Sequence, residues 1–282
     1  MKGYDNMSLP LNFHQTFAPE KEAIAQLVQF ASIHNNNNNY FTKEEISQNT
    51  SIPTGKRSGK VVPHINYAEA MGLIAVEKDG SKYRIKLTPL GKIVCEEDPY
   101  LIEELSNVLC HYNLSRLNSR AKMWSFIFNQ VVKNQGMEIT NNSLKSALNK
   151  FFKVKDVNIT PFRTCYTEDR CFGDLNLLEI VEGKYIFKSH HVDRSYKYLY
   201  GYLLLSNWEI VLPNQTEVTY DTLVNELGFG NPFIWDDTSL DESLEILQEE
   251  RLIIINLQLT PVTYIRQVSS KSLLSKIYSL LI

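Results

Sequence analysis

Residues 59–91 read GKVVPHINYAEAMGLIAVEKDGSKYRIKLTPLG, and this stretch decides the fold of the first part of the chain. Apolar side chains recur at the spacing of one helical face, and Gly72 stands where a helix commonly ends. Two strand-like segments, 73–78 and 82–87, follow and turn at Asp79-Gly80, a pair typical of tight hairpins. The stretch therefore predicts a helix that leads directly into a hairpin.

Two shorter helical patterns precede this stretch. Residues 19–34 place apolar side chains on one face, with a proline in the first turn. Thr42-Lys43-Glu44-Glu45 is a capping box, so a second, short helix is predicted to begin there. The asparagine run 35–39 between the two patterns favours a loop. Helix, short helix, turn, helix and hairpin is the order of a winged helix-turn-helix, whose third helix can enter a major groove while the hairpin contacts the DNA backbone.

A similar order returns in the middle of the chain. Residues 99–135 are expected to be helical throughout, and Thr140 is expected to cap a further helix. Residues 161–176 are expected to be a connecting segment, and 177–188 a hairpin around Glu182-Gly183. A second winged-helix unit is predicted on this basis.

The order returns again near the C-terminus. Helices are expected at 196–207, from Thr219 onward and at 240–251, followed by strands 252–257 and 262–268. The three places where a helix runs into a hairpin have similar sequences with unequal spacing and look like one degenerate repeat: Gly72-Leu73-Ile74, Asn176-Leu177-Leu178 and Arg251-Leu252-Ile253. We predict a mainly α fold with small β-hairpins (α+β), made of tandem winged helix-turn-helix units. The expected domains are an N-terminal winged helix (1–98), a helical region with a second unit (99–190) and a third unit (191–282).

A cluster of cations precedes the predicted third helix of the first unit. Gly55-Lys56-Arg57-Ser58-Gly59-Lys60 is not a phosphate-binding P-loop, because only three residues separate its glycines and Val61 follows the lysine. It is a basic turn in front of a helix, where free amides and cations would face a phosphate. Residues 42–92 hold nine lysines and arginines against five acids, a surplus of four in a protein of net charge -3. Lys56, Arg57, Ser58 and Lys60 are therefore candidate DNA contacts, although a solvated loop remains the alternative.

The predicted hairpin adds further candidates. Lys82, Arg84 and Lys86 alternate with apolar residues, so the pleat of a strand would place all three cations on one face. An ordinary half-exposed strand pair is the alternative. His64 and Asn66 lie early in the predicted third helix, from where they would reach base edges.

The sequence offers no pattern for metal or catalytic chemistry. Cys95, Cys110, Cys165 and Cys171 lack the short paired spacing of zinc sites and disulfide scaffolds, so reduced and mostly buried thiols are expected. Adjacent helical residues point about 100° apart, so Cys110 and His111 cannot act as nucleophile and base. We expect no cofactor, no metal and no enzymatic activity.

Several short motifs together carry a family resemblance. They are His14-Gln15-Thr16-Phe17, Ile52-Pro53-Thr54-Gly55-Lys56, Gly59-Lys60-Val61, Tyr67-Ala68-Glu69, Met71-Gly72-Leu73-Ile74, Leu87-Thr88-Pro89-Leu90-Gly91, Asp98-Pro99-Tyr100-Leu101 and Cys110-His111-Tyr112-Asn113-Leu114. The first half of the chain thereby resembles the prokaryotic domain-of-unknown-function family 4007, although Gln15 replaces the glutamate of the family's His-Glu-Thr-Phe opening. The resemblance implies gene neighbourhoods of DNA phosphorothioation and phage defence, and it supplies no catalytic residues.

Length and composition limit the class of protein. A chain of 282 residues is long enough for two or three domains, and its apolar runs are too short to cross a membrane. No signal-peptide core is seen, so a cytoplasmic location is expected. A pI near 6.1 argues against coating nucleic acid by bulk charge, so any nucleic-acid site would be a local patch.

Three functions follow from these observations. The first is a DNA-binding accessory subunit of a bacterial DNA-modification or phage-defence system, with double-stranded DNA and other subunits as partners. The second is a protein-interaction adaptor of such a system that never touches DNA. An enzyme with a site assembled from His14, His111 and distant acids is less favoured, because no catalytic motif accompanies them.

Overall fold

The computed structural model describes residues 8–55, 59–258 and 260–280. The fold is α+β, with helices as the larger part and small three-stranded antiparallel sheets. The chain divides into two compact units, Met1–Lys188 and Ser189–Ile282. The division lies close to the boundary expected at 190/191, whereas the boundary expected at 98/99 lies inside the first unit. Each unit is described by itself.

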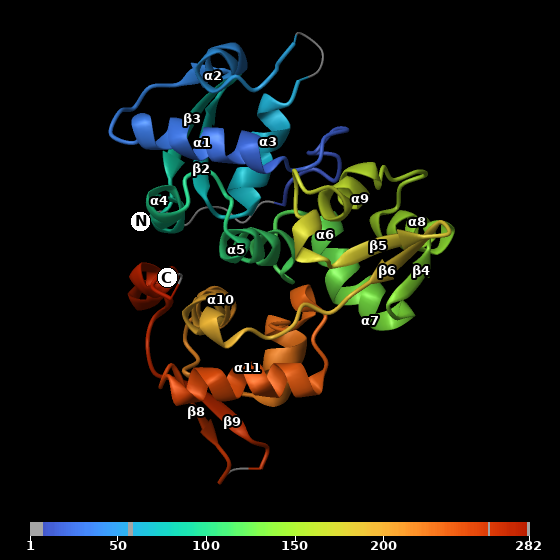
Figure 1. Cartoon of the computed structure of the whole chain (residues 1–282), viewed down its shortest axis with the longest axis vertical. Coiled ribbons are helices and arrows are strands. Elements are labelled where there is room, and N and C mark those ends of the chain that lie inside the picture. The colour runs from blue at the N-terminus through green and yellow to red at the C-terminus, as the bar shows by residue number, and fades with distance from the viewer. Residues whose placement is uncertain (1–7, 56–58, 259, 281–282) are drawn as a thin grey trace. The chain divides into compact units, whose positions relative to one another are not determined.

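The first unit opens with the elements that the capping and turn signals predicted (Figure 1). In chain order they are α1 (Lys21–Ile33), β1 (Phe41–Thr42), α2 (Lys43–Thr50), α3 (Val61–Ala70), β2 (Ile74–Asp79), β3 (Lys82–Leu87) and α4 (Pro89–Glu97). The capping box is present, since the Thr42 hydroxyl accepts from the Glu45 amide and the Glu45 carboxylate accepts from the Thr42 amide. The hairpin turn at Asp79-Gly80 is also confirmed, because Asp79 pairs with Lys82 at its end.

The second half of this unit differs from the sequence expectation in two places. Its elements are α5 (Glu104–Ser115), α6 (Lys122–Phe126), a π-helical turn (Ile127–Val131), α7 (Val132–Gln135), β4 (Glu138–Thr140), α8 (Asn141–Phe152), α9 (Thr160–Thr167), β5 (Leu178–Val181) and β6 (Lys184–Phe187). The helix expected over 99–135 is interrupted between α5 and α6. The connecting segment expected at 161–176 contains α9, because Pro161 fits the first turn of a helix and Asn158 accepts from the Thr160 amide.

The second compact unit contains a third set of elements in the same order. They are α10 (Lys197–Val211), β7 (Glu217–Thr219), a π-helical turn (Thr222–Leu227), α11 (Asp237–Glu249), β8 (Ile253–Asn256) and β9 (Thr263–Arg266). The Asp236 carboxylate accepts from the Ser239 amide, so α11 begins before the expected Leu240.

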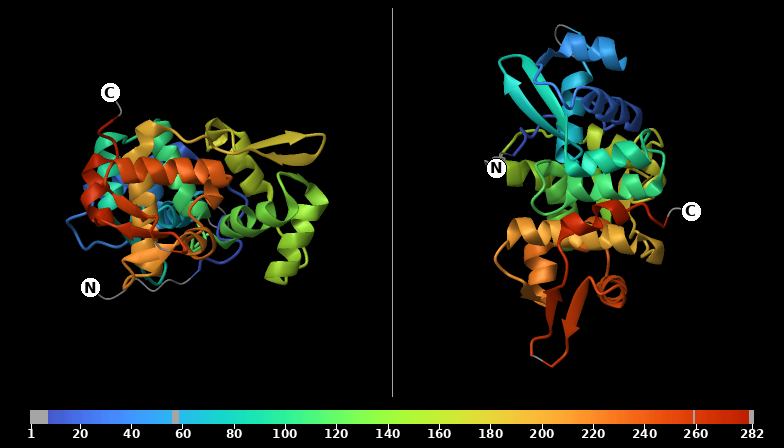
Figure 2. Two further views of the ribbon diagram at one scale, coloured as in Figure 1. Left: turned by 90° about the horizontal axis from the view of Figure 1, so that it is seen from below. Right: turned by 90° about the vertical axis from the view of Figure 1, so that its left-hand side faces the viewer.

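The three sheets share one topology, which defines three repeats: residues 21–87, 122–187 and 197–266. The last strand of each hairpin lies in the centre, in the orders β1-β3-β2, β4-β6-β5 and β7-β9-β8. Figure 2 shows the hairpin of the first repeat (teal) as an arm that extends beyond the helices of its own repeat.

Equivalent hydrogen bonds recur in all three repeats. A threonine ends each short first strand, and its hydroxyl accepts the backbone N–H three residues on, at Thr42, Thr140 and Thr219. A buried leucine follows a residue of positive φ at the start of each hairpin, at Leu73, Leu177 and Leu252. The leucine carbonyls accept the backbone N–H just past the hairpin, from Thr88, Lys188 and Gln267, at 3.1, 3.0 and 3.0 Å. The repeated helix-to-hairpin junctions expected from the sequence are thereby confirmed.

Trp124 joins the first two repeats. Its side chain is fully buried, and its ring lies 5.9 Å from Phe13, 5.8 Å from His14, 5.6 Å from Tyr67 and 5.9 Å from Phe162. Phe13, His14 and Tyr67 come from the start of the chain and from α3, whereas Phe162 lies on α9. Side chains from both repeats therefore share one apolar core.

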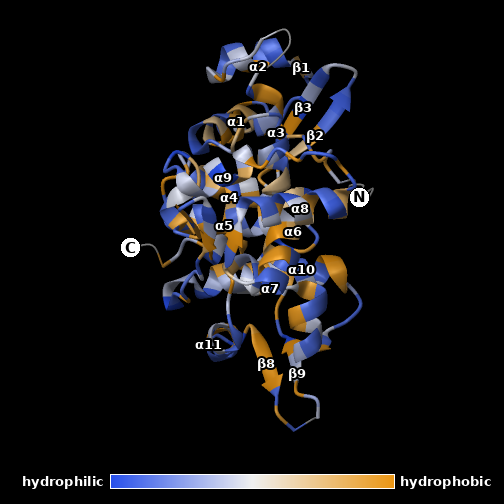
Figure 3. Cartoon of the chain, turned by 90° about the vertical axis from the view of Figure 1, so that its right-hand side faces the viewer, coloured by the Kyte–Doolittle hydropathy of each residue, from blue (hydrophilic) through white to orange (hydrophobic). Residues whose placement is uncertain are grey.

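The hairpins differ in the hydropathy of their residues (Figure 3). The first-repeat hairpin is mostly hydrophilic, whereas β8 of the third repeat is hydrophobic and exposes 46% of Ile254. Among the described residues, no helix has both the length and the apolar character needed to cross a membrane.

Candidate nucleic-acid interface

The basic turn of the first repeat is only partly visible. Lys56, Arg57 and Ser58 lie outside the described residues, so their assignment as DNA contacts stays a prediction. Lys60 is the residue immediately before α3, and its amine lies 2.8 Å from both carboxylate oxygens of Glu20. The same carboxylate also accepts from Arg170 at 2.7 Å. Because Glu20 already neutralises it, Lys60 is a weaker candidate for a phosphate contact than its sequence position indicates.

His64 and Asn66 do not reach the surface, so their expected role at base edges is corrected. His64 is fully buried, and Asn66 is 7% exposed. The Nδ1 of His64 lies 2.7 Å from the Lys60 carbonyl, and its Nε2 accepts from the Glu20 amide at 3.2 Å. The Asn66 amide points to the Phe13 carbonyl. A helical periodicity alone does not reveal that the segment 9–18 covers this face of α3.

Burial of His64 makes stability depend on pH. Burial is the main cause that lowers the pKa of His64 below its ordinary value of 6.5. Below pH 6.5 the unfolded chain therefore binds a proton that the folded chain refuses, and the free energy of unfolding falls as pH falls. The loss amounts to at most about 1.4 kcal/mol per pH unit for one group.

We expect His64→Gln to reduce the change in urea midpoint between pH 7.5 and pH 5.5, because the variant has no imidazole to protonate. His14, whose pKa burial also lowers, should leave a residual dependence of the same sign. Urea titrations of parent and variant at both pH values measure this. Equal pH dependence in both proteins, or a His64 imidazole that titrates by NMR at or above 6.5, would contradict the assignment.

The hairpin of the first repeat presents cations, but two of its three have partners. Lys82 is exposed at the turn end of β3. The Arg84 guanidinium pairs with Glu77 on the neighbouring strand and lies 5.1 Å from the Tyr40 ring. The Lys86 amine lies 3.3 Å from the amide oxygen of Asn38. Ile85, between Arg84 and Lys86, is buried, as the period of two predicts.

The second repeat carries a stronger basic surface that the sequence analysis missed. Residues 116–163 hold nine lysines and arginines against two acids, a surplus of seven. Lys150, Lys153, Lys155 and Arg163 are exposed, and no carboxylate pairs with them in the part of the chain that the structure describes. A count of charge in a sliding window would have found this region, whereas a search for motifs near a hairpin did not.

Local structure holds these cations in place. Leu144 and Leu148 bury one face of α8, which leaves Lys150 on the outer side. The helix ends at Phe152, and the next residue, Lys153, reverses the chain with a φ of 55°. Asn149 then fixes the following loop, because its amide donates to the Lys155 carbonyl at 3.0 Å and its oxygen accepts from the Val157 amide at 2.9 Å. Lys150 on α8, Lys153 and Lys155 in the loop after it, and Arg163 on α9 are together called the α8–α9 basic surface below.

His111 and Asn113 of one family motif have structural partners, and two cysteines are buried. The Nδ1 of His111 lies 2.9 Å from the Tyr166 hydroxyl, and the Asn113 amide donates to the Met71 carbonyl at 3.0 Å. Cys110 and Cys165 are buried, and burial raises the pKa of both thiols. No three His, Cys, Asp or Glu side chains gather closely enough to hold a metal ion within the described ranges.

Comparisons with known proteins agree with this architecture. The family model described as protein of unknown function (DUF4007) matches residues 12–170, and the chain belongs to that family. Two solved structures are similar to the whole chain at 17% sequence identity: a crystal structure of SspB and a magnesium-bound crystal structure of SspB. Each comparison covers 96% of this chain and 86% of the other, with TM-scores of 0.72 and 0.71 respectively. No curated protein matches the sequence. The two structures share the fold of this chain.

Proposed function

We propose that the protein is a non-catalytic, DNA-binding subunit of a bacterial DNA-modification or phage-defence system, built from tandem winged helix-turn-helix units. The repeated order of helix, short strand, two helical segments and hairpin supports this fold interpretation. The family resemblance favours DNA phosphorothioation as the modification. The observation that carries the proposal is the α8–α9 basic surface, with its four exposed cations that lack carboxylate partners.

Duplex DNA is the partner that fits this surface. Lysines and arginines neutralise phosphates without regard to sequence, and such contacts supply most of the affinity of non-specific binding. Lys82 adds an exposed cation on the first-repeat hairpin, where a wing would contact the backbone. We assign duplex binding to these two surfaces of the first compact unit.

We expect the triple variant Lys153→Asn, Lys155→Gln, Arg163→Gln to lower the slope of log affinity against log salt by about 2 to 3. Each lost phosphate contact removes about 0.9 from that slope for duplex DNA. Asparagine is chosen at position 153 because it tolerates the positive φ found there. Lys82→Gln alone should lower the slope by about 1. Gel-shift titrations of a duplex at two salt concentrations measure these changes.

Lys271→Gln is the matched control, because Lys271 is an exposed lysine of the second compact unit. It should leave the slope unchanged. If the parent protein did not bind duplex DNA, or if the triple variant kept the parent's slope, the α8–α9 basic surface would not be a DNA site.

A role as a protein-interaction adaptor has its own support in the second compact unit. Residues 191–282 hold twelve acids against six lysines and arginines. Asp237, Asp241 and Glu245 on α11 line a pocket with Leu244 and Tyr264. Burial and the neighbouring Asp237 raise the pKa of Asp241. A surface of this charge repels phosphates, so we assign contacts with other subunits to this unit.

A further inference from the structure

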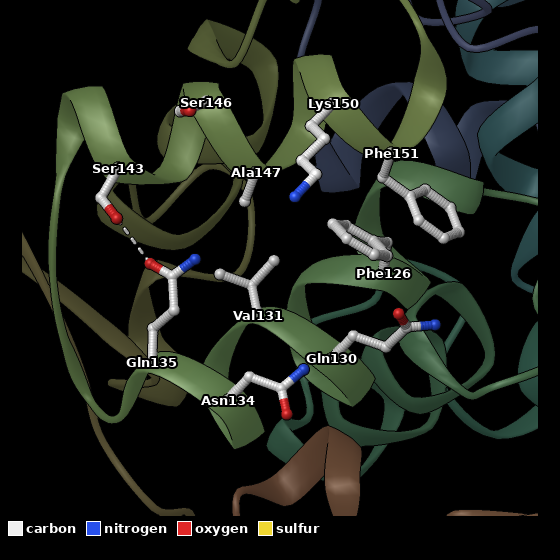
Figure 4. Close-up of a pocket in the computed structure, with 10 residues that line it drawn as sticks. All are labelled: Phe126, Gln130, Val131, Asn134, Gln135, Ser143, Ser146, Ala147, Lys150 and Phe151. Carbon is white, nitrogen blue, oxygen red and sulfur yellow. Dashed lines mark hydrogen bonds between the residues drawn. The ribbon is translucent and has the colours of Figure 1, made fainter.

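A pocket of about 660 Å³ lies between the helical segment 122–135 and α8 in the second repeat (Figure 4). Phe126 and Phe151 stand at one end. At the other end, the Ser143 hydroxyl donates to the amide oxygen of Gln135 at 2.6 Å, which joins the two walls. Val131 and Ala147 form the apolar middle of the pocket.

The aromatic end presents a flat stacking surface. The rings of Phe126 and Phe151 are stacked, with centroids 3.9 Å apart and planes at 22°. Phe126 lies between Phe151 and the middle of the pocket, so one face of its ring is turned toward the pocket (Figure 4). Phe151 is 50% exposed, although side chains of this kind usually dominate protein cores. A partly exposed aromatic pair beside a lysine is an arrangement on which unpaired bases stack.

Polar groups surround this surface. The Lys150 amine points into the pocket, and the amides of Gln130 and Asn134 lie on the opposite wall. Within the described residues, none of these three side chains has a hydrogen-bond or ion-pair partner. Side-chain amides offer the donors and acceptors that match base edges, and a lysine offers a cation to the adjacent phosphate. Lys150 also belongs to the α8–α9 basic surface, and Lys153 and Lys155 follow it in the chain.

We infer that this pocket binds an unpaired nucleobase together with its neighbouring phosphate. The base stacks on Phe126, the amides of Gln130 and Asn134 face its edge, and Lys150 pairs with the phosphate. This inference deepens the proposed DNA-binding function, because it adds a site for an unpaired nucleotide to the duplex-binding surfaces. The base belongs to a single strand of DNA or to a free nucleotide, two sources with the same chemistry.

Fluorescence anisotropy with a labelled single-stranded oligothymidylate tests the inference on the full-length protein. We expect Phe126→Leu to weaken binding about tenfold, because leucine keeps the apolar character of the side chain but removes the flat ring. Lys150→Gln, at an exposed position that does not endanger folding, should weaken it by a similar factor. Ile180→Ala is the matched control, since Ile180 is exposed on β5 outside the pocket and should leave the affinity unchanged. Competition with thymidine monophosphate separates the two sources. If the pocket is a site for free nucleotide, a low concentration of thymidine monophosphate displaces the labelled oligonucleotide; if it is a site for a single strand, a low concentration does not.

Two outcomes would overturn the inference. One is a folded Phe126→Leu or Lys150→Gln protein that keeps the parent's behaviour toward both the single strand and thymidine monophosphate. The other is an apolar peptide that binds in the pocket without displacing the oligonucleotide from the protein. Failure of the proposed function would be seen in a different measurement, the binding of duplex DNA. The residues changed in that test, Lys153, Lys155 and Arg163, lie outside the pocket lining. Their triple variant tests duplex binding, whereas Phe126→Leu tests the single strand without removing a charge.

Discussion

Trp124→Ala should lower the free energy of unfolding of the first compact unit by about 3 to 5 kcal/mol, the usual loss when a buried tryptophan is truncated. The side chain is fully buried, and its ring neighbours come from both repeats of that unit. The cavity would therefore loosen the contact of α3 with α6 and α9 at once. Urea unfolding followed by circular dichroism measures the loss.

Hydrogen exchange shows whether the two repeats unfold together. We expect protection in Trp124→Ala to fall equally around Tyr67 on α3 and around Phe162 on α9, because both rings touch the lost side chain. Tyr100→Ala is the control, since that aromatic side chain is 64% exposed and should change stability by less than about 0.5 kcal/mol. Loss of protection around Phe162 alone would show that the first repeat folds independently.

Gly91→Ala should destabilise the same unit by about 3 kcal/mol or more, at the upper end of overpacking effects. A Cβ at this position would lie 1.8 Å from the carbonyl oxygen of Leu73 and 2.7 Å from its carbonyl carbon. The approach is this close because the Thr88 hydroxyl donates to the Gly72 carbonyl at 2.6 Å and draws α4 onto the start of the hairpin. Backbone atoms cannot move aside as a flexible side chain can. Thermal and urea unfolding measure the change.

Lys92→Ala tests the neighbouring position of the same helix. Lys92 is exposed, and its ion pair with Glu96 at 3.8 Å joins two solvated side chains. Such a pair contributes less than about 1 kcal/mol, so this variant should remain close to the parent. If Gly91→Ala were as stable as Lys92→Ala, α4 would not depend on the close approach to Leu73.

The elements that the sequence predicted well are those with local signals. The capping box at Thr42, the turn at Asp79-Gly80 and the hairpin around Glu182-Gly183 all appear where expected. Caps and tight turns depend on residues that are neighbours in the chain, so their signals survive in any tertiary context. Helix α9 was missed because residues 161–176 were interpreted as a connecting segment, whereas the proline that opens this segment suits a first helical turn.

The candidate site was predicted less well, because the sequence does not show which charged side chains pair with carboxylates or become buried in the folded protein. Lys60 and Arg84 stand in basic stretches, yet Glu20 and Glu77 neutralise them. His64 occupies an early position of the third helix, yet it faces the interior. The α8–α9 basic surface is visible in the composition, but its lack of carboxylate partners is visible only in three dimensions.

By itself, the sequence determined the order of the elements in the first repeat, its caps and turns, and the repetition of the junction at Leu73, Leu177 and Leu252. Only the tertiary structure decided which polar side chains face solvent, since Glu20 meets Lys60 across 40 residues and Arg170 across 150. The physical reason is that hydrogen bonds within a turn depend on local backbone geometry, whereas burial and ion pairing depend on which distant segments the apolar core brings together.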